Sequence, residues 1–321
     1  MPADALIGST GFVGSEIDGQ HDFGVKLNSK TISSAAGQHF RTIVCAAAPG
    51  SMLEANRLPE RDYQRIDQLV GQLSAIGAER FVLISTIAVL DSFAAADEAS
   101  ATFEAKTPYG VNRRRLEEFV ADHFERSLVV RLPALFGEGL KKNFLFDLLN
   151  PVPSMLTREK LANLMSALPG DLATQAEAAY GWDETLSLFV IDRGLLERSG
   201  HRRALDEAVT ALGASAVLFT NPESRFQFYD MSQLWPDIQL ALDHGIDTLH
   251  LAPTPLAAGE IFEALKGQPM PASSARVHSE DMRTAHAGLW GKTGPYKATG
   301  DEVIAGIRAL FACKADAGKP A

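Results

Sequence analysis

The sequence has little of what marks nucleic-acid-binding, disulfide-stabilised or membrane-spanning proteins. Its 321 residues include 30 Lys and Arg against 40 Asp and Glu, and this net charge of −10 opposes general binding to phosphate backbones. The only two cysteines, Cys45 and Cys313, exclude a disulfide framework and a cysteine-based metal cluster. The clearest apolar run, residues 81–90, is too short to cross a bilayer. We therefore expect no nucleic-acid partner and no membrane partner.

Two further kinds of signal are missing. The first residues contain no basic segment followed by an apolar one, and strand-like residues begin at Ala5. We therefore expect no signal or transit peptide and place the protein in the cytoplasm. The 8 histidines are scattered without metal-ligand spacing, so we expect no metal site, and we expect His250 to be structural. Hydrophobic residues at 46% and charged residues at 22% are typical of a globular chain.

Short apolar runs alternate with helical patterns in the first half of the chain. The predicted strands are residues 5–7, 42–47, 81–85 and 128–132, and the predicted helices are 62–78 and 109–124. Apolar strands without polar alternation, separated by helices, are typical of a parallel sheet covered on both faces. We predict an α/β fold with a Rossmann-type doubly wound parallel sheet.

The second half is less regular and begins with a break at Pro151-Val152-Pro153. Its predicted helices are 157–168, 205–212, 231–242 and 256–265, and its predicted strands are 187–191, 216–220 and 248–251. We predict a dinucleotide-binding Rossmann domain over residues 1–150. Residues 151–321 should form mostly a smaller, mixed substrate-binding domain, with some segments returning to the Rossmann domain.

A glycine-rich turn follows the first predicted strand and leads into a helical segment. Gly8 permits the tight turn, Gly11 lets the backbone approach a pyrophosphate, and Gly14 allows close helix–strand packing. The helix N-terminus offers free N–H groups and a partial positive charge to phosphates. The predicted cofactor-binding residues here are Gly8, Thr10, Gly11, Phe12, Val13 and Gly14. The alternative is an ordinary tight turn between a strand and a helix.

Residues at the end of the second predicted strand are expected to contact the adenosine ribose of the cofactor. NAD-binding proteins commonly carry an Asp or Glu there, about 20 residues after the glycine turn. This chain has Asn28, Ser29 and Lys30 instead, which suit a 2′-phosphate better than a free hydroxyl. We therefore predict NADP as the preferred cofactor, with NAD as the alternative. The other interpretation of Lys30 is a solvated surface charge.

Three segments further along the chain contain candidate catalytic or cofactor-binding residues. Tyr109 and Arg113 lie four residues apart in a predicted helix and so share a face. Ser85 and Thr86 close one predicted strand, and the segment Arg131-Leu132-Pro133 closes another. Together with the glycine turn, these segments resemble the extended short-chain dehydrogenase/reductase family, which includes NAD(P)-dependent sugar-nucleotide epimerases and dehydratases. The resemblance covers residues 5–150 and continues more weakly through residues 225–231.

The resemblance implies roles for individual residues. Tyr109 matches the family's general acid/base tyrosine, and Thr86 matches its hydroxyl partner. Arg113 stands in place of the family's lysine; as a permanent cation it can lower the Tyr109 pKa but cannot relay a proton. The expected catalytic residues are thus Thr86, Tyr109 and Arg113. Further expected cofactor contacts are Ala47, Ala48, Ser85 and Pro133.

Lys141, Lys142 and Asn143 follow a glycine-flanked loop near the expected substrate entrance. They are candidates for binding an anionic substrate, and the alternative is a solvated basic patch.

The predicted function is an NAD(P)-dependent oxidoreductase or epimerase/dehydratase acting on a small polar substrate such as a sugar or nucleotide sugar. The alternative is a non-catalytic NADP-binding sensor or interaction protein, which the arginine at position 113 favours. A homodimer is a further expectation from the resemblance.

Overall fold

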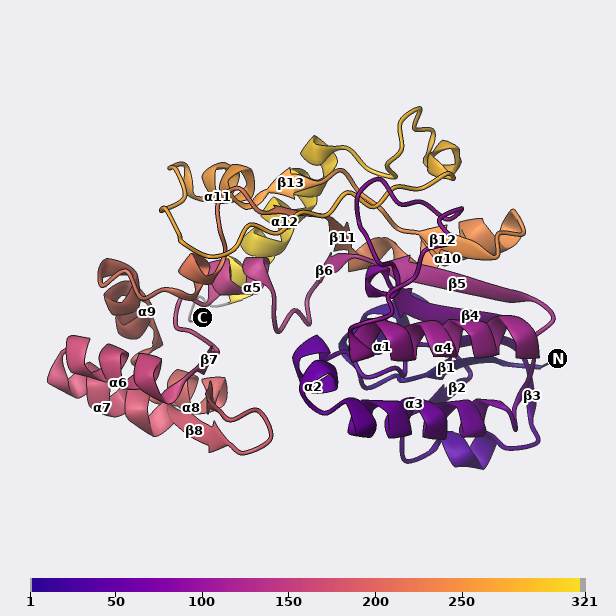
Figure 1. Cartoon of the computed structure of the whole chain (residues 1–321), viewed down its shortest axis with the longest axis horizontal. Helices are drawn as coiled ribbons and strands as arrows, with labels where there is room; N and C mark the ends of the chain where they lie inside the picture. Colours follow the sequence, from indigo (N-terminus) through magenta and orange to yellow (C-terminus); the bar gives the residue numbers. More distant parts are fainter. Residues whose placement is uncertain (1, 318–321) are drawn as a thin grey trace. The chain divides into compact units, whose positions relative to one another are not determined.

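A computed structural model describes residues 2–317 of the chain, with side chains described as far as Lys314. The chain divides into two compact units, and Figure 1 colours them along the sequence. The first unit comprises residues 2–140, 226–256 and 279–317, and the second comprises residues 141–225 and 257–278. The first unit thus ends before the expected boundary at residue 150 and takes up two later segments of the chain. Of the expected second domain, residues 318–321 lie outside the described part.

The first unit is built on a six-stranded parallel sheet in the order β2-β1-β3-β4-β5-β12 (Figure 1). Its strands are β1 (Asp4–Ile7), β2 (Val25–Leu27), β3 (His39–Cys45), β4 (Gly77–Thr86), β5 (Ser127–Leu132) and β12 (Thr248–His250). In the register, Ile7 pairs with both Leu27 and Cys45, so the strand order reverses at β1. Ligands of such sheets bind at the carboxyl ends of the strands, beside this reversal.

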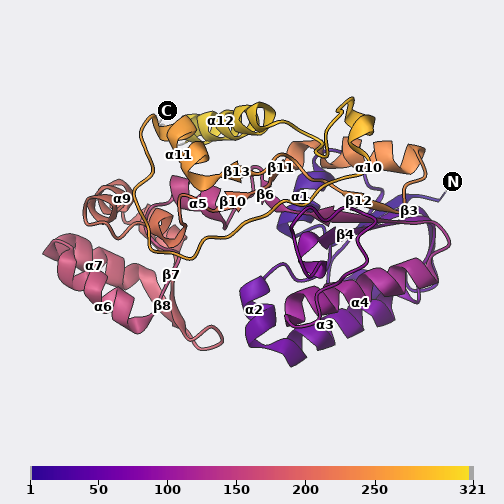
Figure 2. The same cartoon turned by 45° about the horizontal axis from the view of Figure 1, so that its top comes forward.

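Residues of alternate parity on each strand point to opposite faces, and both faces are covered. One face packs against α3 (Pro59–Leu73) and α4 (Pro108–His123), and its core residues include Ile43, Phe81 and Leu116. The other face packs against α1 (Phe12–Asp18) and α10 (Leu234–Asp243) and includes Val44 and Val82. Figure 2 shows α3 and α4 side by side along the first of these faces.

The rest of the first unit surrounds this sandwich. It contains α2 (Met52–Arg57), a 3-10 turn over Ile87–Val89, β6 (Ala134–Phe136), β11 (Phe228–Asp230) and α12 (Gly300–Ala317). Strands β6 and β11 pair in parallel. Further 3-10 turns cover Ile32–Ala35, Met231–Gln233 and Ala287–Trp290. Both α3 and α4 begin with a proline, which fits the first turn of a helix because its missing N–H has no intrahelical partner there.

The second unit has its own small sheet and its own core. Strands β7 (Met155–Leu156), β9 (Leu188–Ile191) and β8 (Tyr180–Asp183) form an antiparallel sheet in that order. Its helices are α5 (Phe144–Leu149), α6 (Arg158–Ala167), α7 (Gly170–Ala179), α8 (Arg193–Arg198), α9 (Arg202–Ala211) and α11 (Ala258–Lys266). The core joins Leu161, Leu164, Ala176, Leu205 and Val209. The remaining strands, β10 (Arg225–Phe226) and β13 (Leu256–Ala257), pair with each other.

The structure confirms the parallel Rossmann-type sheet and changes several predicted elements. Residues 216–220 do not form a strand but a 3-10 turn over Ala216–Phe219. The helix expected over 62–78 spans Pro59–Leu73, because Gly77 and Ala78 already belong to β4. Cys45 is fully buried, and burial raises the pKa of its thiol to about 11, as befits a core residue. In the described residues, no helix is long and apolar enough to cross a membrane.

Candidate active site

The glycine turn lies at the point where the strand order reverses. Gly8 has a φ of +91°, and a Cβ there would lie 2.6 Å from the carbonyl carbon of Ala46, just after β3. A Cβ on Gly14 would lie 2.0 Å from the Gly8 carbonyl oxygen. No larger residue fits either position, since carbon atoms do not approach a backbone so closely. This contact also places Ala47 beside Gly8, because a Cβ on Gly8 would lie 2.8 Å from the Ala47 nitrogen.

The first turn of α1 keeps its backbone donors available. Gly11 is its N-cap, without a side-chain cap and without an acidic residue in the first turn. The first N–H groups of a helix have no intrahelical acceptor, which leaves the Phe12 and Val13 amides for an anion. The Phe12 and Val13 side chains are half-buried and pack against the core, and their backbone amides are the groups that suit an anion. Thr10 is exposed.

The predicted ribose-reading residues follow β2 directly. The Leu27 carbonyl accepts from the Gly8 amide at 2.8 Å, so β2 ends against the glycine turn. Asn28 Oδ1 accepts from the Lys30 amide at 2.9 Å, which commits the Asn28 side chain to a local turn. Ser29 and Lys30 are exposed, and no carboxylate occurs among these three residues. Of the three side chains, Ser29 and Lys30 are therefore the ones best able to meet a ligand.

The tyrosine and threonine that the sequence predicts to be catalytic come from elements that are in direct contact. Thr86 ends β4, and its Oγ1 accepts from the Ala88 amide at 3.2 Å in the following 3-10 turn. A Cβ on Gly110 would lie 2.1 Å from the Ala88 carbonyl oxygen, so α4 begins in direct contact with that turn. The Tyr109 amide donates to Asn56 Oδ1 at 3.0 Å, which joins α4 to α2. The structure thus brings Tyr109 to the end of β4, where Thr86 lies.

Arg113 shares the expected face with Tyr109 but is not a free cation. Its guanidinium carbon lies 4.0 Å from the centre of the Tyr109 ring. Its two terminal nitrogens donate to the Asp62 carboxylate and to the Pro49 carbonyl oxygen. Asp62, on α3, also accepts from Asn112 Nδ2 at 2.8 Å. Arg113 and Asp62 are only 2% and 3% exposed, so this is a buried ion pair.

The pKa of Tyr109 depends on burial and on the charges of Arg113 and Asp62. Burial raises the pKa of the Tyr109 hydroxyl above its ordinary value of about 10, and the nearby Asp62 carboxylate raises it further. The Arg113 charge and hydrogen bonding to Thr86 lower this pKa, but they do not outweigh burial. Arg113 thus lowers the Tyr109 pKa as expected, but burial outweighs this contribution and the net pKa lies above its ordinary value.

The Ser85 side chain belongs to a buried network with Glu117 and Arg131. Its hydroxyl donates to Glu117 Oε1 at 2.5 Å, on the face of α4 that packs on the sheet. Arg131 donates to both oxygens of the same carboxylate, at 3.0 and 2.7 Å. The Ser85 hydroxyl is therefore buried and already has an acceptor, and its contact with a cofactor stays a prediction.

The network continues to His250, which is buried and has a hydrogen-bond partner at each ring nitrogen. Arg131 donates to His250 Nε2 at 3.2 Å, and the Arg283 carbonyl lies 3.0 Å from His250 Nδ1. Because arginine can only donate, Nε2 accepts and the ring proton sits on Nδ1, which makes the imidazole neutral. Burial lowers the pKa of His250, and the Arg131 charge lowers it as well. The Glu98 carboxylate accepts from the His250 amide at 2.8 Å.

The remaining candidates lie in different surroundings. Ala47 and Ala48 are half-buried after β3 and pack on the core, and Pro133 is buried after β5. Lys141 and Lys142 are exposed at the start of the second unit. Asn143 has a φ of +107°, and its Oδ1 accepts from the Leu145 amide at 3.0 Å as the N-cap of α5. The Asn143 carboxamide oxygen is therefore used to begin a helix.

Sequence reasoning missed three residues around Tyr109 and Arg113. Asp62 pairs with Arg113, Asn112 donates to Asp62, and Asn56 accepts from the Tyr109 amide. One signal was present for the ion pairs. Positions 113, 116, 117, 120 and 124 share one face of the helix, and three of them are the apolar Leu116, Val120 and Phe124. An Arg and a Glu within that stripe must be buried, and a buried charge requires a partner. The pattern could have predicted two ion pairs, though not their partners.

Comparison with known proteins finds solved structures with the same fold. No family model matches the chain, and no curated protein matches it in sequence. A UDP-N-acetylglucosamine 4-epimerase from Methanobrevibacter ruminantium M1, in complex with UDP-N-acetylmuramic acid, superposes with a TM-score of 0.61 at 12% identity, covering 98% of this chain and 99% of that one. A dTDP-4-dehydrorhamnose reductase from Bacillus anthracis, in complex with NADP, gives 0.58 at 14% identity, covering 97% and 98%.

A UDP-glucose 4-epimerase from Thermotoga maritima, solved with UDP-glucose, gives a TM-score of 0.56 at 13% identity and covers 97% of this chain and 99% of that one. These matches extend over nearly the whole of both chains and include both units. At such low identity they establish the architecture. The chain therefore shares the fold of these reductases and epimerases.

Proposed function

We propose that this chain is an NAD(P)-dependent oxidoreductase or epimerase/dehydratase that acts on a small polar substrate such as a sugar or nucleotide sugar. The observation that carries the proposal is the position of Tyr109 and Thr86 at the carboxyl end of β4, in the sheet whose strand order reverses beside the glycine turn. A tyrosine hydroxyl and a threonine hydroxyl there can hold a carbonyl or carbinol oxygen and transfer its proton. Catalysis would rest on Thr86, Tyr109 and Arg113.

The residues around the glycine turn fit a dinucleotide. Gly8 and Gly14 pack so closely that the turn stays tight, and the first turn of α1 presents amide donors without a nearby acidic cap. A pyrophosphate is the ligand that such a helix start commonly binds. The absence of a carboxylate after β2, together with the exposed Lys30, favours NADP over NAD. When bound, the nicotinamide would supply hydride chemistry.

The choice of a nucleotide sugar draws support from the neighbours, two of which were solved with UDP-linked ligands. We propose that the second unit supplies the substrate contacts, with Lys141 and Lys142 exposed to meet an anionic group. We also propose a cytoplasmic protein that works on small molecules, and a homodimer consistent with the resemblance.

One observation favours the alternative, a non-catalytic NADP-binding sensor. The cation beside Tyr109 is paired with Asp62, and the Tyr109 pKa is raised. A protein that binds the nucleotide without turning over substrate would tolerate such a change. Tight nucleotide binding without turnover of any aldehyde, ketone or nucleotide sugar would favour this alternative over the enzyme.

The proposal is tested by calorimetry with NADPH and NADH, followed by nicotinamide absorbance with a panel of carbonyl compounds and nucleotide sugars. NADPH should bind more tightly than NADH. Gly11→Val should abolish binding, because its side chain would occupy the space that the pyrophosphate needs. Gly71→Val is the matched control, since Gly71 is exposed on α3 with open space around its Cβ position. Failure of both nucleotides to bind at millimolar concentration would refute the proposal.

A further inference from the structure

The connection from β6 to α5 begins with a loop that is held by helix α1 (Figure 1). The Glu16 side chain, on α1, accepts a hydrogen bond from the Gly139 amide at 2.7 Å through Oε1. A Cβ on Gly137 would lie 2.8 Å from Glu16 Oε2, so both carboxylate oxygens face this loop. A Cβ on Gly139 would lie 3.0 Å from Phe12 Cδ2, one helical turn before Glu16. The two glycines thus let the loop approach α1 closely.

Other contacts fix the same loop within the first unit. The Lys314 ammonium, on α12, donates to the Glu138 carbonyl oxygen at 2.8 Å. The Leu140 amide donates to the Gly137 carbonyl oxygen at 3.3 Å, and the Leu140 side chain is buried. The second unit begins at the next residue. Residues 137–140 therefore form a tight turn that is anchored immediately before the chain enters the second unit.

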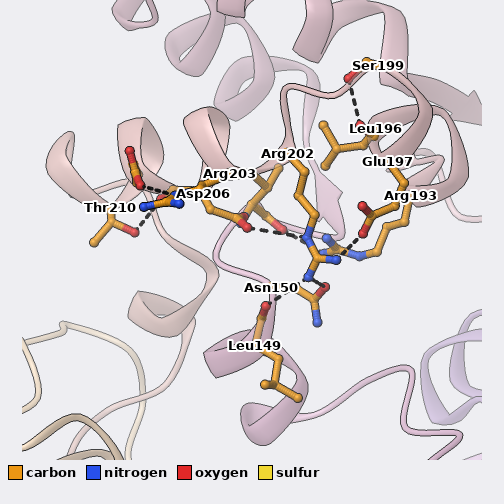
Figure 3. Close-up of polar contacts among 12 residues, drawn as sticks. Leu149, Asn150, Arg193, Leu196, Glu197, Ser199, Arg202, Arg203, Asp206 and Thr210 are labelled. Atoms are coloured by element: carbon orange, nitrogen blue, oxygen red, sulfur yellow. Dashed lines mark hydrogen bonds and ion pairs between the residues drawn. The ribbon is translucent and has the colours of Figure 1, made fainter. Parts of the chain in front are cut away.

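The far end of the connection is anchored inside the second unit. The Arg202 Nη2 donates to the Leu149 carbonyl oxygen at 3.3 Å and to Asn150 Oδ1 at 3.1 Å (Figure 3). Asn150 Nδ2 in turn donates to the Phe146 carbonyl oxygen at 2.9 Å, which closes the last turn of α5. Residues 141–143, which are the proposed substrate contacts, lie in the sequence between these two anchored points.

The length of the chain limits where Lys141 can lie. It follows Gly139 by two residues, so the two Cα atoms are at most about 7 Å apart. Glu16 follows Phe12 by four residues, which is about 6 Å along the axis of α1. The first amides of this helix are the proposed pyrophosphate donors. The carboxylate of Glu16 therefore links the start of the substrate-binding segment to the helix that would bind the nucleotide.

We propose that Glu16 is a positioning residue that couples the dinucleotide site to the substrate-binding residues 141–143. This inference rests on the proposed function. Because the carboxylate holds the Gly139 amide, ordering of the first turn of α1 on nucleotide binding extends to the loop. Lys141 and Lys142 then meet the anionic group of the substrate from a fixed starting point. Glu16 itself contacts neither the substrate nor the reacting atoms in this mechanism.

The direct test is hydrogen exchange of the full chain with and without NADPH, measured in peptides that cover residues 8–14 and 137–140. In the wild type, saturating NADPH should slow exchange in both segments. Without nucleotide, Glu16→Ala should speed exchange of the loop by about 10–100-fold, because the Gly139 amide loses a charged acceptor. NADPH should still protect residues 8–14 of this variant but no longer residues 137–140. A merely structural contact would leave the response of the loop to NADPH intact.

Asp18→Asn is the matched control. Asp18 lies on the same helix and pairs with Lys26 at 2.8 Å, so its substitution removes an ion pair of α1 that does not involve the loop. Both segments should exchange as in the wild type. Glu16→Gln should fall between the wild type and Glu16→Ala, because its carboxamide oxygen can still accept from the Gly139 amide without the negative charge.

Gly139→Ala makes the same test from the loop, even if Glu16→Ala does not fold. Its methyl group would lie 3.0 Å from Phe12 Cδ2 and 3.3 Å from Glu16 Oε1, so the loop must move away from α1. Gly181→Ala is its control, since the space around that Cβ position is open. Equal protection of residues 137–140 by NADPH in the wild type and in these loop and helix variants would overturn the inference. So would a wild-type loop that NADPH does not protect, although it binds.

The kinetics of turnover supply a second readout. Glu16→Ala should raise the KM for a nucleotide sugar by about tenfold or more, while the Kd for NADPH changes by less than about twofold. The KM for an uncharged carbonyl compound should not change, because such a substrate does not need Lys141 or Lys142. Loss of NADPH binding in Glu16→Ala would show that Glu16 maintains α1 itself, and the inference would fail while the proposed function stands. If the wild type binds neither nucleotide, the proposed function fails as well.

Discussion

Neutralising Glu117 should destabilise the first unit far more than a change at a surface ion pair. Glu117 and Arg131 are 2% and 3% exposed, and the Glu117 carboxylate accepts from both ends of the Arg131 guanidinium and from Ser85. Glu117→Gln keeps the shape and removes the charge, so Arg131 is left buried without a counter-ion. Breaking a buried pair in this way costs about 3–5 kcal/mol. At about 2–4 °C per kcal/mol, the Tm should fall by roughly 6–20 °C.

The assay is thermal and urea unfolding followed by circular dichroism. Glu207→Gln is the control, because Glu207 pairs with Arg203 while 67% exposed, and such a pair is worth about 1 kcal/mol or less. A double variant, Glu117→Met with Arg131→Met, should lose less stability than Glu117→Gln, since it removes both charges. A loss below about 1 kcal/mol for Glu117→Gln would show that Arg131 finds another partner or water, and the argument from burial would fail.

Two further predictions concern pH and catalysis. Burial raises the pKa of Asp147 to about 7, against an ordinary value of about 3.9, so the folded state holds a proton that the unfolded state has lost. Stability should therefore fall as pH rises from about 4 to 7 and then level off. Asp147→Asn should remove up to about 4 kcal/mol of this fall, measured by urea unfolding against the exposed control Asp171→Asn, and an unchanged pH profile would contradict it. Tyr109→Phe and Thr86→Val should each reduce turnover by roughly 10²–10⁴-fold without loss of nucleotide binding, and a variant with wild-type turnover would remove that residue from the mechanism.

The sheet could be predicted from the sequence because its strands are short apolar runs with no polar alternation. Residues 81–85 and 128–132 lie within β4 and β5, and the glycine turn follows β1 as its spacing indicated. The strand predicted over residues 216–220 is wrong because this segment is also a short apolar run. A short apolar run is compatible with a strand or with a buried turn, and the local sequence does not distinguish them.

Residues of the candidate site could be predicted only where they belong to a recognisable sequence motif. Tyr109 and Thr86 could be named from their order and spacing, and the structure brings them together. The partner of Arg113 could not be named, because Asp62 lies on another helix and their contact depends on how α3 and α4 pack. The net rise in the Tyr109 pKa could not be predicted for the same reason. A positive side chain one turn away says nothing of its counter-ion or of the burial of the phenol.

The strand order of the first unit has a consequence for biosynthesis. The edge strand β12 and helix α10 cover β5 and the face that contains Leu128 and Val130, yet the ribosome reaches them only after residues 141–225. At about 5–20 residues per second, a nascent chain would carry an unpaired strand edge and a bare apolar face for roughly ten seconds. Such an edge is a template for aggregation. Chains that stall before α10 should therefore depend on chaperones, whereas completed chains should not.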